Sequence, residues 1–282
     1  WDSRTPGGIG IIGCGNFASR VLVPELRRQG ASPSVFASAN GLSAKLLAGN
    51  AATSTTDSSA LLDQPGLSTV FIATRHDEHG ELVRAALRAS KKVWVEKPLA
   101  LTEADLDATM AVARASSGLL AVGFNRRFAP LAVRLRAALA SKSGPRRFTM
   151  DINAGRLPAG HWTLDAKQGG GRIVGEACHF VDLLRFLSGC TIATARALSR
   201  DGDGQDGGCF ELSFANGDIA ALNYRTDLPA HLPKERIAVV GEGWSAEIDN
   251  WRSLRSQNLP SASTLPTWLG GPARGKGHAE AL

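Results

Sequence analysis

The sequence predicts an α/β protein of two domains, in which a doubly wound parallel sheet is followed by an α+β domain. Through about residue 122, short apolar segments alternate with helical segments, as in consecutive β-α-β units. After Gly123 the apolar segments lengthen and alternate with polar residues, which favours a mostly antiparallel sheet. The chain of 282 residues is long enough for two domains of ordinary size.

The first domain, residues 1–122, is expected to hold strands separated by helices. Gly30 ends the first helix, and Thr102 is expected to cap the last helix because Glu103 and Asp105 lie in its first turn. The predicted strands cover residues 9–12, 33–37, 69–73, 92–95 and 119–122. The predicted helices cover residues 17–29, 43–48, 78–89 and 102–115.

The second domain, residues 123–282, is expected to form an antiparallel sheet with one helix packed on it. The helix covers residues 174–187 and is followed by Gly189, and Asn216-Gly217 indicates a hairpin between two strands. The predicted strands cover residues 148–153, 209–214, 219–224, 236–240 and 244–248. Residues 257–277 are rich in Pro, Gly and Ser and are expected to form a loop.

The composition argues against several classes of protein. The formal net charge is +6, but the basic residues are dispersed, which fits an anionic ligand or an ordinary solvated surface better than a nucleic-acid partner. No apolar run approaches the roughly 20 residues that span a bilayer, so no membrane partner is expected. The widely separated cysteines fit neither a zinc site nor a disulfide framework, so we expect no metal and a reducing, cytoplasmic setting.

A glycine-rich turn directly follows the first predicted strand and opens a helix. Gly13, Gly15, Asn16, Phe17 and Ala18 have the spacing of a dinucleotide-binding turn. The first glycine makes the tight turn, the second lets the backbone approach a pyrophosphate, and the small Ala18 permits close helix packing. The N–H groups at the helix start would bind the phosphates. This context favours a Rossmann domain over a purely structural glycine turn.

The end of the second strand bears on the choice between NAD and NADP. An NAD site usually places an acidic residue there to bind the ribose 2′-hydroxyl, and none is present. Ser38, Asn40 and nearby Lys45 could instead accommodate a 2′-phosphate, which favours NADP slightly. An NAD site with neutral contacts to the ribose is the alternative.

The segment after the third strand is expected to lie over the pyrophosphate and the nicotinamide ribose. Thr74, Arg75 and His79 are therefore candidate cofactor contacts. His79 and its neighbour His76 fit equally well as residues that begin a helix.

Glu96-Lys97-Pro98 ends the apolar strand at residues 92–95. A lysine at the carboxyl end of a parallel strand lies where open α/β sheets bind their ligands. Beside a nicotinamide, its ammonium group could give or take the proton that accompanies a hydride. Alone, the tripeptide is more typical of an exposed strand end stopped by proline. With a dinucleotide turn upstream, we interpret Lys97 as catalytic and both Glu96 and Lys97 as cofactor contacts.

A second cluster of candidate residues begins with three glycines at residues 169–171, which allow close approach to a ligand. Glu176 and His179 fall on one face of the following helix, and a carboxylate beside an imidazole can relay protons. A surface helix with an incidental histidine is the alternative. Candidate contacts to hydroxyl or anionic groups of a substrate are Arg127, Asn153, His161, Asp165, Arg172 and Lys234.

Together these motifs resemble the glucose–fructose oxidoreductase / inositol dehydrogenase (Gfo/Idh/MocA) family over nearly the whole chain. The resemblance rests on the dinucleotide turn, on Glu96-Lys97-Pro98 and on the glycine loop that leads to His179 and Asp182. It implies an N-terminal Rossmann domain, a C-terminal domain with a large, mostly antiparallel sheet, and a homo-oligomer. It also implies NAD(P)-dependent oxidation or reduction of a sugar or cyclitol, with Lys97 catalytic and His179 relaying protons.

The chain departs from the family pattern at one position. Members commonly carry an aspartate four residues before the histidine, where this chain has Gly175 and places its acid one residue later, at Glu176. The longer side chain of Glu176 keeps it a catalytic candidate. One residue is nevertheless a rotation of about 100° on an α-helix, so Lys97 and His179 are expected to carry more of the chemistry.

A narrower resemblance comes from residues 124–130, His161-Trp162 and residues 175–180. These phrases are similar to a subgroup in which such a chain follows a zinc-type alcohol dehydrogenase domain in one polypeptide. The missing initial methionine and the clipped end at residues 277–282 then favour a truncated part of a longer dehydrogenase.

The predicted function is hydride transfer between NAD(P) and a secondary alcohol or ketone of a sugar, nucleotide-sugar or cyclitol-like substrate. One alternative is a reductase of an imine or another non-sugar substrate. An alternative of a different class is a cofactor-binding domain that has lost catalysis. The glycine at position 175, in place of the usual acid, is the feature that supports this alternative.

Overall fold

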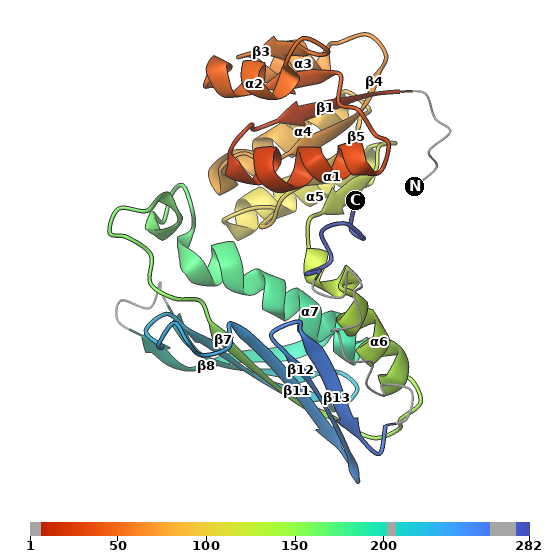
Figure 1. The fold of residues 1–282 in the computed structure, drawn as a ribbon, viewed down its shortest axis with the longest axis vertical. Helices are drawn as coiled ribbons and strands as arrows, with labels where there is room; N and C mark the ends of the chain where they lie inside the picture. The colour runs from red at the N-terminus through yellow and green to blue at the C-terminus, as the bar shows by residue number, and fades with distance from the viewer. Residues whose placement is uncertain (1–6, 202–206, 260–274) are drawn as a thin grey trace. The chain divides into compact units, whose positions relative to one another are not determined.

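The computed structural model describes residues 7–201, 207–259 and 275–282 (Figure 1). By its contacts the chain divides into two compact units. The first unit contains the chain through Gly123 together with Ala166–Gly170 and Leu282, and the second contains Phe124–Asp165 and Gly171–Ala281. The predicted fold class, a Rossmann domain and an α+β domain with a large, mostly antiparallel sheet, is confirmed.

The first unit is built on six parallel strands in the order β3-β2-β1-β4-β5-β6. The strand order reverses between β1 and β4, and open α/β sheets bind ligands at such a point, outside the carboxyl ends of the strands. The strands are β1 (Gly8–Ile12), β2 (Val35–Ala37), β3 (Thr53–Thr55), β4 (Leu67–Ile72), β5 (Lys92–Val95) and β6 (Leu120–Val122).

Helices connect these strands. The predicted cap of α5 is confirmed, because the hydroxyl of Thr102 accepts a hydrogen bond from the N–H of Asp105 at 3.2 Å. The helix after the glycine turn begins with a π-helical turn, η1, which the sequence did not indicate. The helical elements are η1 (Ala18–Leu22), α1 (Val23–Arg28), α2 (Gly41–Ala48), α3 (Ser58–Leu62), η2 (His76–Glu78), α4 (His79–Arg88) and α5 (Glu103–Ala115).

The central strands of the parallel sheet are buried on both faces. Adjacent residues of β1 belong to different hydrophobic clusters, since Ile11 packs with Phe36 and Phe71, whereas Ile12 packs with Val70. This explains why these central strands are almost continuously apolar in sequence. The sheet is therefore a rigid support for the loops at its carboxyl edge.

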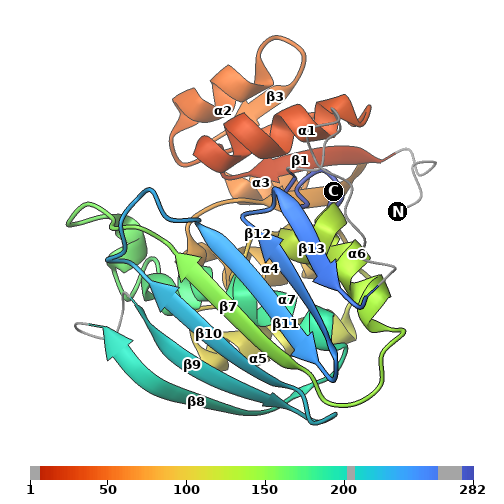
Figure 2. The same ribbon diagram turned by 60° about the horizontal axis from the view of Figure 1, so that its bottom comes forward.

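The second unit contains seven strands in the order β13-β12-β11-β7-β10-β9-β8 (Figure 2). All neighbouring pairs are antiparallel except β7 with β10. The predicted Asn216-Gly217 turn joins β9 to β10, with a φ of +86° at Gly217. The strands are β7 (Arg147–Asn153), β8 (Ile192–Asp201), β9 (Gly207–Phe214), β10 (Ile219–Arg225), β11 (Glu235–Gly241), β12 (Trp244–Asp249) and β13 (Ser253–Gln257).

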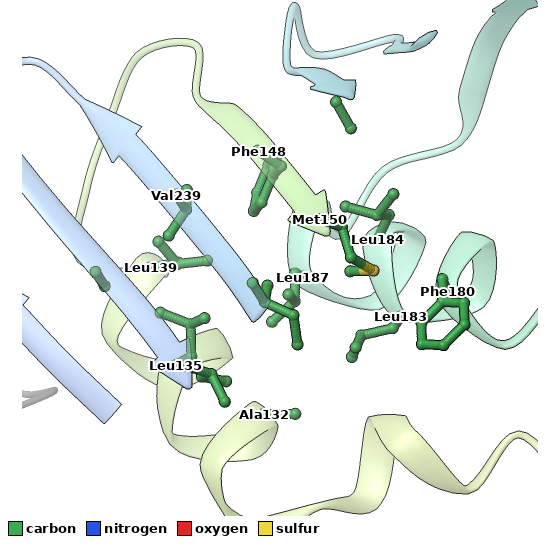
Figure 3. Close-up of a cluster of buried hydrophobic side chains, with 14 of the residues drawn as sticks. Ala132, Leu135, Leu139, Phe148, Met150, Phe180, Leu183, Leu184, Leu187 and Val239 are labelled. Atoms are coloured by element: carbon green, nitrogen blue, oxygen red, sulfur yellow. The ribbon is translucent and has the colours of Figure 1, made fainter. Parts of the chain in front are cut away.

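Two helices, α6 (Pro130–Leu139) and α7 (Cys178–Ser188), pack on one face of this sheet, so the prediction of a single packed helix is wrong. Figure 3 shows side chains of both helices meeting those of β7 and β11, among them Leu135, Leu183 and Phe148. Shorter helical turns are η3 (Asn125–Phe128), η4 (Trp162–Leu164) and the π-helical η5 (Ile173–Ala177).

The loop predicted at residues 257–277 falls mostly on residues 260–274, which lie outside the described residues. In the parts of the chain that the structure describes, no helix has the length and apolarity required to cross a membrane.

Candidate active site

The glycine turn of the first unit has the geometry that its sequence predicts. Gly13 has a φ of +92°, and a Cβ there would lie 2.5 Å from the carbonyl carbon of Ala73 and 2.6 Å from the nitrogen of Thr74. Its N–H donates to the carbonyl of Ala37 at 2.9 Å. Only glycine fits this position. Gly15 is exposed, and a Cβ there would meet nothing within 4 Å, so a ligand can approach the backbone.

A hollow of about 400 Å³ opens beside the turn. Ala18 is fully buried, as expected for the small residue that allows the helix to pack closely. Asn16 is exposed, whereas Phe17 stacks on Trp94 with ring centroids 6.5 Å apart. The hollow is lined by Cys14, Gly15, Asn16, Ser19, Ser43, Leu46 and Leu47.

The end of β2 presents hydroxyl and amide groups. The hydroxyl of Ser43 lies 3.1 Å from that of Ser38 and 2.8 Å from the carbonyl of Asn40. The Asn40 side chain caps α2 by accepting a hydrogen bond from the N–H of Leu42 at 3.1 Å. Lys45 is exposed on the same helix. This edge therefore carries hydroxyl groups and a cation in place of the carboxylate typical of NAD sites.

The loop after β4 holds five residues that come from much later in the chain. We call these residues, Ala166–Gly170, the strap; they belong to the first unit. The guanidinium of Arg75 donates to the side-chain oxygen of Gln168, and Nδ1 of His76 lies 2.9 Å from the carbonyl oxygen of Gly169. Arg75, a predicted cofactor contact, and its neighbour His76 thus hold the strap.

Glu96 and Lys97 follow β5 and are both half-buried. The N–H of Glu96 donates to the carbonyl of Ile72 at 2.9 Å, and the N–H of Lys97 faces the Glu96 carboxylate at 3.3 Å. The Lys97–Pro98 peptide bond is cis. The predicted cofactor residues at the ends of β1, β2, β4 and β5 therefore share one edge of the sheet.

The structure places His79 at the first position of α4 and buries it completely, which agrees with the alternative that it begins a helix. Its Nδ1 lies 2.7 Å from the carbonyl oxygen of Pro98. Burial is the main cause that lowers the pKa of His79. Burial also lowers the pKa of His76 to about 4, and the Lys97 ammonium acts in the same direction on both rings. Both imidazoles are therefore neutral at neutral pH.

In the second unit, the helix that carries His179 begins with the π-helical turn η5. A π-turn closes from i to i+5, so the rotation between positions 175 and 176 is smaller than in an α-helix but is not removed. The carboxylate of Glu176 accepts hydrogen bonds from Arg172 at 2.8 Å and from the Tyr224 hydroxyl at 2.6 Å. Burial and the Glu176 charge raise the pKa of Tyr224. Arg172 also donates to the carbonyl of Ala154, so it joins η5 to the segment after β7.

His179 lies on the second residue of α7 and is 8% exposed. Its ring meets that of Phe124 edge to face, with centroids 6.2 Å apart. Gly175, where family members commonly have an acid, is buried within η5. The imidazole is thus held by packing at the start of the helix.

Two predicted substrate contacts are held by other groups of the second unit. Arg127 forms a two-pronged ion pair with Asp182, which is itself 7% exposed. Arg172 is committed to Glu176, as described above. Both guanidinium groups therefore form ion pairs with carboxylates of the second unit, Asp182 and Glu176.

The remaining predicted contacts are dispersed. The Asn153 amide donates to the carbonyl of Pro229 at 2.9 Å, and its N–H donates to the carbonyl of Lys234. His161 accepts a hydrogen bond from the N–H of Thr163 at the start of η4. The side chains of Lys234 and Asp165 are exposed.

A buried ionic cluster surrounds Glu235, and no sequence pattern predicted it. This carboxylate has no exposed surface and accepts two bonds from Arg126, at 2.8 and 3.0 Å. Trp251 Nε1 donates to it at 2.6 Å and Lys276 at 2.5 Å. The cationic neighbours lower the pKa of Glu235 to about 2 despite its burial. The partners are far apart in sequence, so no spacing could reveal them.

A second hollow, of about 520 Å³, lies beside α7 in the second unit. Its lining is mostly apolar, and none of the predicted site residues contributes to it. The lining includes Phe124, Ile173, Val174, Val181, Phe210 and Leu222.

The sheet order, the glycine turn and the antiparallel second sheet define a nucleotide-binding protein of the two-domain oxidoreductase class. Residues 8–124 match the family described as "Oxidoreductase family, NAD-binding Rossmann fold", and residues 133–247 match the "GFO/IDH/MocA C-terminal domain". The chain belongs to the Gfo/Idh/MocA family.

Two curated relatives are similar to this chain. Inositol 2-dehydrogenase 2 of Saccharopolyspora erythraea is 32% identical over 201 residues, which are 67% of this chain and 56% of the relative. The 1,5-anhydro-D-fructose reductase of Ensifer adhaerens is 30% identical over 206 residues, which are 70% of this chain and 62% of the relative. Each match spans less than two thirds of the relative's length.

A solved structure shares the fold. GenD2 from gentamicin A biosynthesis, in complex with NAD, has a TM-score of 0.81 at 22% identity. The match covers 100% of this chain and 85% of GenD2.

Proposed function

We propose that this chain forms an NAD(P)-dependent dehydrogenase or reductase that acts on a secondary alcohol or ketone of a sugar, nucleotide-sugar or cyclitol-like substrate. The observation that carries the proposal is the single sheet edge at which the open backbone of Gly15 and Lys97, two residues after β5, both lie. The names of the relatives, an inositol dehydrogenase and an anhydrofructose reductase, support the substrate class.

The residues at this edge fit a dinucleotide. The turn from Gly13 to Ala18 would hold the pyrophosphate, Ser38 and Asn40 the adenosine ribose, and Thr74 and Arg75 the nicotinamide side. The hollow of about 400 Å³ beside the turn supplies room for part of such a ligand. A bound nicotinamide would supply or accept the hydride.

The end of β2 favours NADP as the dinucleotide. The hydroxyl groups of Ser38 and Ser43 lie 3.1 Å apart, and Lys45 adds a positive charge to α2. A 2′-phosphate would accept hydrogen bonds from these hydroxyl groups and from the Lys45 ammonium. The carboxylate found at this position in NAD sites would instead repel the phosphate. The expected result is tighter binding of NADPH than of NADH.

Lys97 and His179 are proposed to move the proton. In oxidation the substrate hydroxyl would lose its proton to one of these two groups as its carbon loses a hydride; in reduction the oxygen would regain the proton. Glu176 is tied to Arg172 and Tyr224, which supports a role in fixing the start of the helix that carries His179. Asp165 and Lys234 are exposed and are the preferred candidates for substrate contacts.

The first experiment identifies the nucleotide. Mass spectrometry of the purified protein would detect any retained NAD(H) or NADP(H), and fluorescence titration would give Kd for NADH and NADPH. Equal binding of the two, or tighter NADH, would contradict the NADP assignment. Binding of neither would remove the oxidoreductase proposal itself.

The second experiment tests Lys97. Turnover is screened with inositols, 1,5-anhydro-D-fructose, nucleotide-sugars and imines, and then measured in Lys97→Ala and in the control Lys92→Ala. The control lies at the opposite end of the same strand, β5. We expect Lys97→Ala to slow turnover by about a hundredfold or more and Lys92→Ala to have little effect. Near-normal turnover of Lys97→Ala would exclude it as the acid/base, and turnover only on imines would favour the alternative reductase.

A further inference from the structure

We propose that His79 is a positioning residue for Lys97, acting through the hydrogen bond between its imidazole and the carbonyl oxygen of Pro98. His79 is the first residue of α4 and has no exposed surface. Its Nδ1 lies 2.7 Å from that oxygen, which belongs to the residue directly after Lys97. The proposal rests on the proposed function because it presumes that the place of the Lys97 ammonium matters for proton transfer.

The hydrogen bond has one possible direction. A carbonyl oxygen only accepts, so Nδ1 of His79 carries the hydrogen. The ring stays neutral because burial and the Lys97 ammonium both disfavour its charged form. The backbone groups of Pro98 and Thr74 and the Asp77 carboxylate favour the charged form, but burial outweighs them. The second imidazole nearby, that of His76, is also neutral at neutral pH.

The bond matters because the Pro98 carbonyl is buried with its residue. A buried carbonyl that lacks a donor is costly, so the loop would move if the donor were removed. On the other side of Lys97, the N–H of Glu96 donates to the carbonyl of Ile72 at 2.9 Å. Lys97 is thus bracketed by one bond to the end of β4 and one bond to the start of α4.

Three substitutions of His79 distinguish the loss of its hydrogen-bond donor from a change in the size of its side chain. His79→Asn keeps an N–H donor on the atom bonded to Cγ, as in the Nδ1–H of histidine. His79→Leu fills similar space without a donor. His79→Met also lacks an N–H donor and has a more flexible apolar side chain. If His79→Leu does not fold by circular dichroism, His79→Met takes its place in each comparison.

The first measurement needs no substrate. Lysines are reductively methylated with ¹³C-formaldehyde, and the Lys97 signal is assigned by its absence in Lys97→Arg. We expect this signal at its wild-type position in His79→Asn and shifted towards that of exposed lysines in His79→Leu. The ¹⁵N spectrum of wild-type His79 should show the Nδ1–H tautomer. An unchanged Lys97 signal in His79→Leu, or the Nε2–H tautomer, would overturn the proposal.

The second measurement uses a substrate found by the screen. We expect His79→Leu to lower kcat tenfold or more while KM and the Kd for NADPH stay within about twofold, and His79→Asn to keep kcat within threefold. A merely structural role would lower the melting temperature without moving the Lys97 signal. Equal kcat in the two variants would overturn the proposal. Failure to find any turnover in the wild type would count against the proposed function, and the ¹³C result would still decide the placement of Lys97.

Discussion

Gly13→Ala should mainly lower the stability of the fold, whereas Gly15→Ala should mainly weaken cofactor binding. Gly13 has a φ of +92° and is wedged against Ala73 and Thr74, whereas a Cβ at Gly15 meets nothing within 4 Å. The two residues are two positions apart in the same turn, so each serves as the control for the other. The first should be needed for folding and the second for binding.

The magnitudes follow from the geometry. A left-handed backbone costs a residue with a Cβ about 1–2 kcal/mol. The atoms that a Cβ at Gly13 would meet, at 2.5–2.6 Å, are backbone atoms of the loop after β4, which cannot turn aside. Such overpacking costs about 1–3 kcal/mol more. Gly13→Ala should therefore lower the free energy of unfolding by about 2–5 kcal/mol, and Gly15→Ala should change it by less than about 1 kcal/mol.

The assay combines urea unfolding, followed by circular dichroism, with fluorescence titration of NADPH. We expect Gly15→Ala to unfold like the wild type and to bind NADPH at least tenfold more weakly, a loss of about 1.4 kcal/mol, because its methyl group occupies the approach to the pyrophosphate. Wild-type affinity in Gly15→Ala would refute the placement of the dinucleotide on this turn. Wild-type stability in Gly13→Ala would refute the packing argument.

Further predictions concern three buried groups, Glu235, Tyr224 and His76. Glu235→Gln should lower the free energy of unfolding by about 3–5 kcal/mol in urea, because it leaves the buried Arg126 without its counter-charge; a loss below 1 kcal/mol would contradict this. Since the pKa of Glu235 falls from 4.5 to about 2 on folding, its stabilisation should be complete above pH 4.5 and lost as the pH falls towards 2. Tyr224→Phe should cost about 1–2 kcal/mol in the same assay by removing a donor from Glu176, with NADPH affinity unchanged. Because the pKa of His76 falls from 6.5 to about 4, the unfolded chain binds the proton first, and stability should decrease from pH 6.5 to pH 4. His76→Asn should reduce that slope, and an equally steep profile would show that the ring is not buried neutral.

Several strongly patterned elements were predicted from sequence, whereas two weakly patterned strands, β3 and β8, were missed. Residues 92–95 and the cap at Thr102 were predicted correctly because apolar runs and capping residues act locally. The edge strand β3 contains only Thr and Ser, so it has no apolar pattern. Most of β8 is exposed along its length, so burial imposes no alternation on it.

The candidate site was predictable where the chain brings its residues together locally. The glycine turn and the strand end at Lys97 follow from the order of strands in the sheet. The orientation of His79 was not predictable, because the carbonyl that accepts its hydrogen bond is 19 residues away. The pairing of Glu176 with Tyr224 depends on contacts across 48 residues and on a π-turn that no sequence rule indicated.

The strap has a consequence for how the protein is made. The sheet of the first unit ends with β6 at Val122, but His76 meets Gly169 across 93 positions. On the ribosome, the chain from Gly123 to Gly170 takes roughly 2–10 s to synthesise. During that interval the parallel sheet can form before Gln168 and Gly169, which bind Arg75 and His76, have been synthesised. A fragment that ends at Gly123 would lack the strap permanently. A fragment designed to contain the whole first unit should therefore include residues 166–170.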